Sequence, residues 1–277
     1  MNYRHAYHAG NFADVFKHAL LMRILTYLMR KDTPLRYLET HGGIGLYDLS
    51  SEEAQKTGEW REGIARLWQA QLSGEAAQLL APYLALTQQF EGRYPGSPMI
   101  AKSLLRAQDR LTICELHPHD ERRLVKNLGR DSRVKVLAMD GYQALKAGVP
   151  PAERRGLVLI DPPFEQRDEF STLEKAIALA HGKWANGCFA IWYPLKATPE
   201  VDAFRARMGK GDIRRVLCLE MQIDHLQSEG PLKGCGLIVI NPPFALEAEA
   251  RQLLPLFTSL LAQGRDAAWR ISWLAGE

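Results

Sequence analysis

Short apolar runs alternate with helix-favouring stretches along most of this 277-residue chain. Four of the runs are followed by glycine-rich or acidic positions: a glycine-rich turn ends the segment Leu35–Gly45, and an acid ends Leu111–Glu115, Val134–Asp140 and Leu157–Asp161. Strands that alternate with helices predict an α/β fold with a doubly wound, mostly parallel sheet. Ligands bind beyond the carboxyl ends of the strands in such sheets, so we expect these positions to line one crevice.

The interval between the glycine-rich turn and the strand that ends at Glu115 is unusually long. It spans about seventy residues, whereas one strand–helix–strand unit needs roughly thirty. Residues 51–93 favour helix. We therefore expect a small inserted helical subdomain over 51–93 and a main domain made of residues 1–50 and 94–277.

The C-terminal third contains further strand patterns. Cys188–Leu195, Arg215–Ile223 and Gly236–Ile240 are apolar runs, and Ala267–Gly276 is a candidate for another strand. The second and third of these runs are expected to pair as a hairpin-like edge.

The first helix is expected to begin at Asn11, a favourable N-cap residue, because apolar residues follow it at helical spacing. Asn11, Asp14 and His18 form a polar stripe along the same helix. Such a stripe is either solvated or directed toward a ligand, and the helical pattern by itself leaves both interpretations open.

Composition restricts the class of protein. The formal net charge is only +3, so a polyanionic partner would have to bind a local patch. The four cysteines lie singly in apolar runs without a Cys-x-x-Cys pair, which predicts reduced core thiols and no metal site. The polar and aromatic N-terminus does not resemble a signal peptide, and no run is long enough to span a bilayer. We expect a cytoplasmic protein without a membrane partner.

The crevice residues favour a nucleoside ligand. The turn that contains Gly42 lacks the full G-x-G-x-x-G spacing of dinucleotide folds, yet it allows close approach of the backbone to a ligand. Glu115 suits the two hydroxyls of a ribose, and Asp140 with Gly141 suits an exocyclic adenine amine. No Walker motif is present to hold a triphosphate. The combination favours S-adenosylmethionine over ATP or NAD, and a nicotinamide oxidoreductase remains a weaker alternative.

The tetrapeptide Asp161–Phe164, Asp-Pro-Pro-Phe, predicts the chemistry. An exocyclic aromatic amine is a poor nucleophile because its lone pair is delocalised into the ring. The Asp161 carboxylate and the Pro162 carbonyl can accept both of its N–H groups and stabilise the charge that develops on nitrogen. Phe164 offers a face on which a base can stack. The alternative is that the prolines only end a strand.

A second tetrapeptide, Asn241–Phe244, reads Asn-Pro-Pro-Phe and repeats the pattern. Its position near the C-terminus is where this kind of fold closes its sheet with an antiparallel strand, so Asp161 is the preferred catalytic candidate.

The chain resembles a known family. Asp-Pro-Pro-Phe after an apolar strand is the amino-methyltransferase signature, and the whole chain is similar to the bacterial ribosomal RNA large subunit methyltransferase J family. The resemblance runs nearly end to end, and its most specific segments are "YRHAYHAGNFADVFKH" and "YPGSP". It implies a Rossmann-like class I methyltransferase domain with a helical insertion, S-adenosylmethionine as cofactor, and methylation of adenine N6 in 23S ribosomal RNA. It also suggests a monomer.

The resemblance implies roles for individual residues as well. It places the following residues in the cofactor pocket: His18, His41, Ser97, Glu115, Asp140 and Gly141. It assigns catalysis to Asp161 and an RNA contact to Tyr3. Arg4 and His5 beside Tyr3 add cationic and aromatic groups that suit phosphates and bases. The polar stripe, with Lys17 beside His18, is then better explained as facing the cofactor. Many members of the family carry tyrosine where Phe164 stands.

Other targets for the same tetrapeptide are adenine in DNA and a glutamine amide in a protein. A DNA enzyme needs a module that reads bases in the major groove, and no such basic module is evident. An RNA-binding scaffold with an inactive pocket is disfavoured by the intact Asp161 and Glu115.

Overall fold

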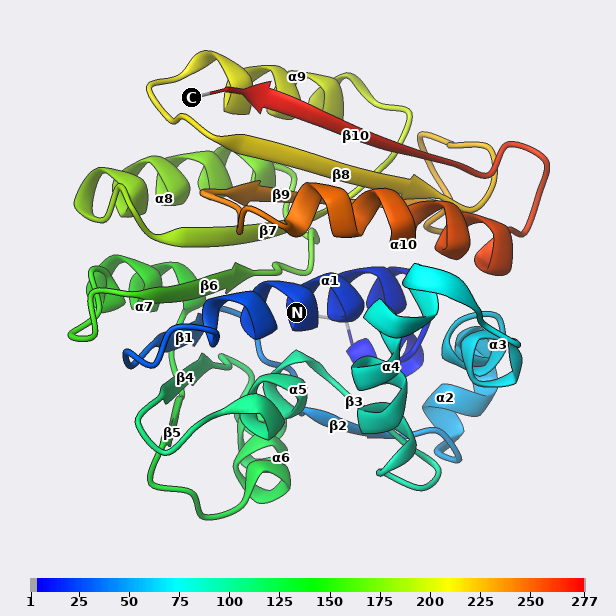
Figure 1. The fold of residues 1–277 in the computed structure, drawn as a ribbon, viewed down its shortest axis with the longest axis horizontal. Helices are drawn as coiled ribbons and strands as arrows, with labels where there is room; N and C mark the ends of the chain where they lie inside the picture. The colour runs from blue at the N-terminus through cyan, green and yellow to red at the C-terminus, as the bar shows by residue number, and fades with distance from the viewer. Residues whose placement is uncertain (1–3, 277) are drawn as a thin grey trace.

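A twisted sheet of eight strands forms the centre of the protein (Figure 1). The computed structural model describes residues 4–276. The strands are β1 (Arg36–Glu39), β2 (Leu46–Asp48), β3 (Arg93–Pro95), β4 (Arg110–Cys114), β5 (Val134–Leu137), β6 (Gly156–Ile160), β7 (Cys188–Pro194), β8 (Val216–Gln222), β9 (Gly234–Ile240) and β10 (Ala268–Ala275). The order across the large sheet is β10-β8-β9-β7-β6-β1-β4-β5, and β2 pairs with β3 separately.

The sheet is parallel from β5 to β7, which confirms the predicted doubly wound α/β fold. The carboxyl ends of β1, β4, β5, β6 and β7 therefore meet at one edge. The strand β9 runs antiparallel to both β7 and β8, and β10 runs antiparallel to β8. The expected hairpin-like pairing of the two C-terminal runs is confirmed.

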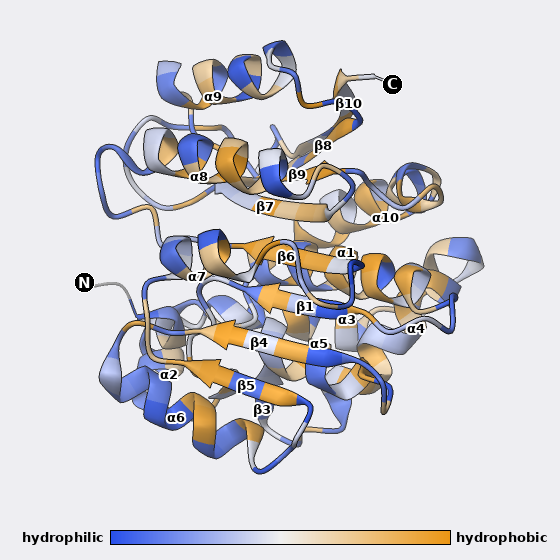
Figure 2. Ribbon diagram, turned by 90° about the vertical axis from the view of Figure 1, so that its left-hand side faces the viewer, coloured by the Kyte–Doolittle hydropathy of each residue, from blue (hydrophilic) through white to orange (hydrophobic). Residues whose placement is uncertain are grey.

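Helices cover both faces of the sheet. They are α1 (Phe12–Leu28), α2 (Glu52–Thr57), α3 (Ile64–Gln69), α4 (Gly74–Gln88), α5 (Ser97–Leu104), α6 (Pro118–Leu128), α7 (Gly141–Gly148), α8 (Glu169–Lys183), α9 (Pro199–Lys210) and α10 (Leu246–Leu261), with 3₁₀ turns η1 (His5–Tyr7) and η2 (Glu59–Arg61). Alternate residues of β6 enter opposite cores: Leu157 and Leu159 pack with α1 and α10, whereas Val158 and Ile160 pack with α8 and α9. Figure 2 shows the apolar strands between these two helical layers.

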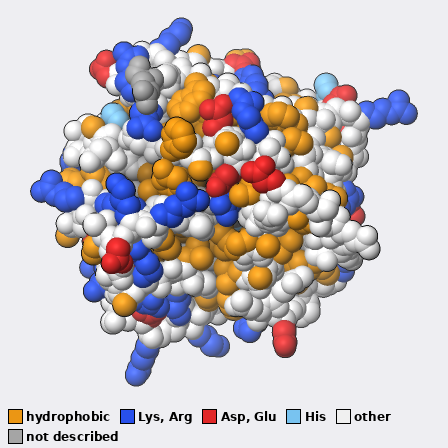
Figure 3. Space-filling view, in the orientation of Figure 1, with side chains coloured by type: hydrophobic (Ala, Val, Ile, Leu, Met, Phe, Trp, Pro, Cys, Tyr) orange, Lys and Arg blue, Asp and Glu red, His pale blue; other side chains and the backbone are white. Residues whose placement is uncertain are grey.

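The predicted helical region 51–93 contains α2, η2, α3 and α4. The short pair of β2 and β3 brackets it, because Leu46 pairs with Pro95 and Asp48 with Arg93. On the face formed by α1, α4 and α10, apolar side chains reach the surface near the centre, and Lys and Arg side chains lie both among them and at the rim (Figure 3). Among residues 4–276, no helix combines the length and apolar character needed to cross a bilayer.

The strands are slightly shorter than the sequence pattern predicts. Glu115 and Asp161 each lie one residue beyond the end of their strand, and β5 ends at Leu137, three residues before Asp140. The expectation that the third strand extends to Asp140 is therefore wrong. Asp140 instead caps α7, where its Oδ1 accepts a hydrogen bond from the Gln143 backbone N–H at 2.9 Å.

Candidate active site at the carboxyl edge of the sheet

A cavity of about 1270 Å³ lies at the edge where the parallel strands end. The described candidate residues from the sequence all border it except Arg4: His5, Lys17, His18, His41, Gly42, Ser97, Glu115, Asp140, Gly141, Asp161, Pro162 and Phe164. The structure thus brings together segments that are far apart in the sequence. Tyr3 lies outside the described residues, and Arg4 is exposed, with its guanidinium 4.0 Å from the Glu53 carboxylate.

The glycine-rich turn after β1 is held close to its neighbours. Gly43 has a φ of +58°, a left-handed conformation that glycine adopts without strain. A Cβ atom at Gly42 would lie 2.3 Å from Cγ2 of Ile113, and one at Gly141 would lie 2.2 Å from the Thr40 carbonyl oxygen. Both positions therefore require glycine, and the turn and the start of α7 approach each other more closely than side chains allow.

Glu115 follows β4 and anchors the glycine-rich turn. Its Oε2 accepts the Gly43 N–H at 2.8 Å, and its Oε1 accepts the His117 N–H at 2.8 Å. Each carboxylate oxygen has a second acceptor direction, so the group can still bind two hydroxyls. Burial raises the pKa of the Glu115 carboxyl, and the two backbone N–H groups oppose that shift.

His41 lies between the turn and α7. Its Nδ1 is 2.8 Å from the Thr40 hydroxyl, and its ring packs edge-on against Tyr142 with centroids 5.6 Å apart. Burial lowers its pKa to about 4, so the ring is neutral at neutral pH. The Tyr142 hydroxyl donates to Glu169 at the start of α8, which connects this wall of the cavity to the loop that follows Asp161.

Asp161 is tied to the first helix by Lys17. The Lys17 ammonium donates to Asp161 Oδ2 at 2.6 Å and lies 3.1 Å from Asp14 Oδ1. The Asp161 side chain is 17% exposed, and its Oδ1 has no hydrogen-bond partner within residues 4–276. The carboxylate is therefore fixed at one oxygen and open to the cavity at the other.

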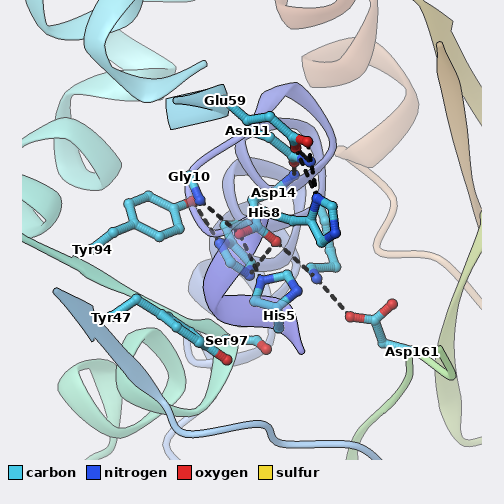
Figure 4. Close-up of polar contacts among 12 residues, drawn as sticks. His5, His8, Gly10, Asn11, Asp14, Tyr47, Glu59, Tyr94, Ser97 and Asp161 are labelled. Carbon is cyan, nitrogen blue, oxygen red and sulfur yellow. Dashed lines mark hydrogen bonds and ion pairs between the residues drawn. The ribbon is translucent and has the colours of Figure 1, made fainter. Parts of the chain in front are cut away.

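The polar stripe of α1 is buried. Asp14 accepts from His5 at 2.9 Å and from the Gly10 N–H at 2.9 Å, and Figure 4 shows these groups converging beside Asp161. Burial alone would raise the pKa of Asp14, but the charges of His5 and Lys17 outweigh it and hold the pKa well below its usual value. The solvated interpretation of the stripe is therefore wrong.

His18 occupies the inner end of the stripe. Its Nδ1 is 2.7 Å from the Tyr94 hydroxyl, and its side chain is 1% exposed. Burial lowers its pKa to about 3, so the ring is neutral and forms part of the cavity floor.

Phe164 forms an aromatic wall with two neighbours. Its ring centroid lies 4.9 Å from that of Phe170 and 6.0 Å from that of Trp192 on β7. Phe164 has a φ of +50°, in the left-handed region that is unfavourable for a side chain of this size. With this backbone conformation the Phe164 ring borders the cavity.

The second tetrapeptide lies at the opposite edge of the sheet. Because β9 runs antiparallel to β7, the end of β9 lies beside the start of β7, where Ile240 pairs with Phe189. Asn241 follows Ile240 and therefore lies at that edge. The Asn241 amide donates to the carbonyls of Ala185 and Gly187, both at 2.8 Å. Asn241 does not border the cavity, and its bonds fix the turn before β7.

Three contributors were missed in the sequence. Glu39, at the end of β1, is fully buried beneath the cavity, where it accepts from the hydroxyls of Tyr37 and Ser97. Burial raises its pKa to about 8. An acid at the end of an apolar run is the signal that could have identified Glu39, as it does for Glu115. Trp192 gave no signal within its apolar strand, and Asp14 was noted only as part of the stripe.

One group of described residues has the spacing to hold a metal ion. The ligand atoms of His117, His119 and Asp120 lie within 4.8 Å of one another. His117 and Asp120 are partly exposed and His119 more so, and the cluster is at the N-terminal end of α6 rather than beside Asp161.

Comparison with known proteins agrees with this arrangement. A family model described as ribosomal RNA large subunit methyltransferase D, RlmJ, matches residues 32–275. Proteins named ribosomal RNA large subunit methyltransferase J are 40% identical in Haemophilus influenzae and 39% identical in Escherichia coli, with 100% of both chains covered. The crystal structure of protein LPL1258 from Legionella pneumophila has a TM-score of 0.87 and 37% identity, and the match covers 96% of this chain and 98% of that one. The chain belongs to the ribosomal RNA large subunit methyltransferase J family.

Proposed function

We propose that this protein transfers a methyl group from S-adenosylmethionine to N6 of an adenine in 23S ribosomal RNA. Its fold is the Rossmann-like methyltransferase fold expected from the sequence. The observation that carries the proposal is the Asp161 carboxylate, which is anchored by Lys17 at Oδ2 and open to a large cavity at Oδ1. The named relatives, which act on large-subunit ribosomal RNA according to their names, support the choice of substrate.

The cofactor fits the half of the cavity over β1, β4 and β5. Glu115 would accept the ribose hydroxyls, and Asp140, whose Oδ2 is unbonded within the described chain, would accept from the adenine amine. The glycines at 42, 43 and 141 leave room for the adenosyl group at the strand ends. His18, His41 and Ser97 complete the wall, and Lys17 links this half to Asp161.

S-adenosylmethionine supplies the methyl group as an electrophile on a positively charged sulfur. Asp161 Oδ1 and the Pro162 carbonyl accept the two N–H groups of the target amine, which directs its lone pair toward the methyl group. Lys17 holds the carboxylate in place through Oδ2. As the new N–C bond would form, the sulfur–methyl bond would break and release neutral S-adenosylhomocysteine. The amine would lose one proton along its hydrogen bond to Asp161, which is positioned to receive it.

Stacking on Phe164 would hold the target base in the aromatic wall. The N-terminal residues Tyr3, Arg4 and His5 are proposed to contact the RNA near the entrance, where His5 already lines the cavity. We further propose that the protein acts in the cytoplasm as a monomer without a metal ion, and that residues 51–93 form an inserted subdomain on the main domain of residues 1–50 and 94–277.

The proposed substrate class is tested by incubation of the protein with methyl-labelled S-adenosylmethionine and separate pools of ribosomal RNA, transfer RNA, DNA and protein. Label is expected in large-subunit ribosomal RNA. Incorporation into DNA or protein instead would favour one of the alternative amine targets.

Replacement of Glu115 by alanine is expected to weaken cofactor binding by about 1–3 kcal/mol, because charge-assisted hydrogen bonds to the ribose are lost. Calorimetric titration with S-adenosylmethionine measures the effect. Glu121→Ala on α6 removes the same charge outside the cavity and serves as the control. An unchanged affinity in a folded Glu115→Ala protein would rule out the ribose role.

Phe164→Ala is expected to lose about 1–3 kcal/mol of base stacking, seen as a lower kcat/KM for RNA at saturating cofactor. Phe164→Tyr keeps the aromatic face and should retain most of the activity. Equal activity of the alanine and tyrosine variants would show that the ring packs against Phe170 and Trp192 without contacting the base.

A further inference from the structure

The cavity is larger than a cofactor alone requires. Its volume of about 1270 Å³ exceeds the roughly 300–1,000 Å³ of ordinary small-molecule pockets. The proposed cofactor residues follow β1, β4 and β5, which all lie on one side of β6 in the sheet order. The strands β7 and β9 lie on the other side of β6, as Figure 1 shows. Asp161 at the end of β6 therefore divides the cavity into two halves.

The second half, which we call the β7 side, has a lining of its own. It is formed by the end of β7, the connection to α9, the β8–β9 loop and the α10–β10 loop, through Trp192, Lys196, Thr198, Leu232, Lys233 and Gln263. None of these residues has a part in the proposed cofactor site. A nucleophile must approach the methyl group from the side opposite its sulfur. With the cofactor over β1, β4 and β5, the incoming substrate reaches Asp161 from the β7 side.

The cations on the β7 side have no carboxylate partner in the described structure. Lys196 is partly buried and makes no hydrogen bond or ion pair within residues 4–276. Lys233 donates only to the neutral Gln263 side chain, at 3.0 Å. Most other partly buried cations of the described chain are paired with a carboxylate, for example Arg36 with Glu153. Unpaired ammonium groups at the rim of a cavity are suited to bind an anion.

Carboxylates also border the cavity nearby, including Glu165, Asp168 and Glu200. The surface is therefore not a uniform positive field, in keeping with the small net charge of +3. Recognition here depends on individual contacts at fixed positions. The aromatic rings of Phe164 and Trp192 border the same cavity as these lysines and Asp161, which favours a ligand that combines phosphates with flat bases over an acidic peptide.

We propose that the β7 side of the cavity binds the RNA strand next to the target nucleotide, with Lys196 and Lys233 pairing with backbone phosphates. This inference rests on the proposed function and adds to it the path that the RNA backbone takes across the protein. The target base is turned into the aromatic wall beside Asp161, while its flanking phosphates follow the end of β7 and the β8–β9 loop.

The test is the RNA affinity of the double variant Lys196→Ala/Lys233→Ala, measured by fluorescence anisotropy with a labelled fragment of large-subunit ribosomal RNA at several salt concentrations. The Kd is expected to rise on the order of tenfold. The slope of log K against log salt should become shallower by about 1.4, since each single-strand phosphate contact contributes about 0.7. Affinity for S-adenosylmethionine should not change.

The matched control is Lys126→Ala/Arg130→Ala, which removes two exposed charges at the C-terminal end of α6, outside the cavity. It should bind RNA nearly as the unmodified protein does. A Lys196→Ala/Lys233→Ala protein with unchanged Kd and unchanged slope, or with losses equal to those of the control, overturns the assignment. Methyl transfer by the unmodified enzyme to the same RNA is measured in parallel, and its absence would contradict the proposed function itself.

Discussion

Asp161→Ala is expected to lower the rate of methyl transfer about 10²–10³-fold while cofactor affinity stays nearly the same. The substitution removes the preorganised acceptor for the target amine and touches neither Glu115 nor Asp140. Lys17 keeps an ionic partner in Asp14, 3.1 Å away, so the helix retains its buried charge pair. Single-turnover transfer to ribosomal RNA, with folding checked by thermal melting, measures the effect.

Asn241→Ala is the matched control, because it truncates the equivalent position of the second tetrapeptide. Its loss of two hydrogen bonds to Ala185 and Gly187 affects the turn before β7 and hence stability. The rate per folded molecule should remain close to that of the unmodified enzyme. Asp161→Asn retains one oxygen acceptor without the charge. Its rate of methyl transfer is expected to lie between the rates of Asp161→Ala and Asn241→Ala. An inactive Asn241→Ala with an active Asp161→Ala would exclude Asp161 as the catalytic group.

Glu249→Ala is expected to destabilise the fold by about 3–5 kcal/mol, the largest stability effect we predict for a single substitution. Glu249 on α10 accepts two hydrogen bonds from Arg23 on α1, at 2.7 and 2.8 Å, and both side chains are only about a tenth exposed. Removal of the carboxylate leaves the guanidinium buried without its partner, and the desolvation of that charge is then uncompensated. Chemical denaturation gives the change in the free energy of unfolding.

The same helix offers a control for this effect. Arg251 pairs with Glu247 on α10, but the Arg251 side chain is 53% exposed. Arg251→Ala should cost about 0–1 kcal/mol, because an exposed pair is screened by water. If Glu249→Ala costs no more than Arg251→Ala, the buried pair does not stabilise the contact between α1 and α10.

Several parts of the site could be predicted because they depend on local pattern and sheet geometry. Apolar runs followed by acids located Glu115 and Asp161, and the rule that parallel strands end at one edge brought them together. The antiparallel direction of β9 also follows from its place after the doubly wound core, and it separates Asn241 from the cavity.

Other parts could not be read from local pattern. The contact between Lys17 and Asp161 joins residues 144 positions apart, and it depends on how α1 crosses the end of β6. Burial of the polar stripe on α1 depends on η1 and Glu59 covering it, since His8 and Asn11 both bond to Glu59. The sequence pattern also did not show that β5 ends at Leu137 and that Asp140 caps α7.

The most direct test of the account is the identity of the methylated nucleoside. Unmethylated 23S ribosomal RNA is incubated with the enzyme and methyl-labelled S-adenosylmethionine, digested to nucleosides and separated by chromatography with mass detection. The account predicts label in N6-methyladenosine with the unmodified enzyme, and little or none with Asp161→Ala. Label in a nucleoside other than N6-methyladenosine, or full labelling with Asp161→Ala, would contradict it.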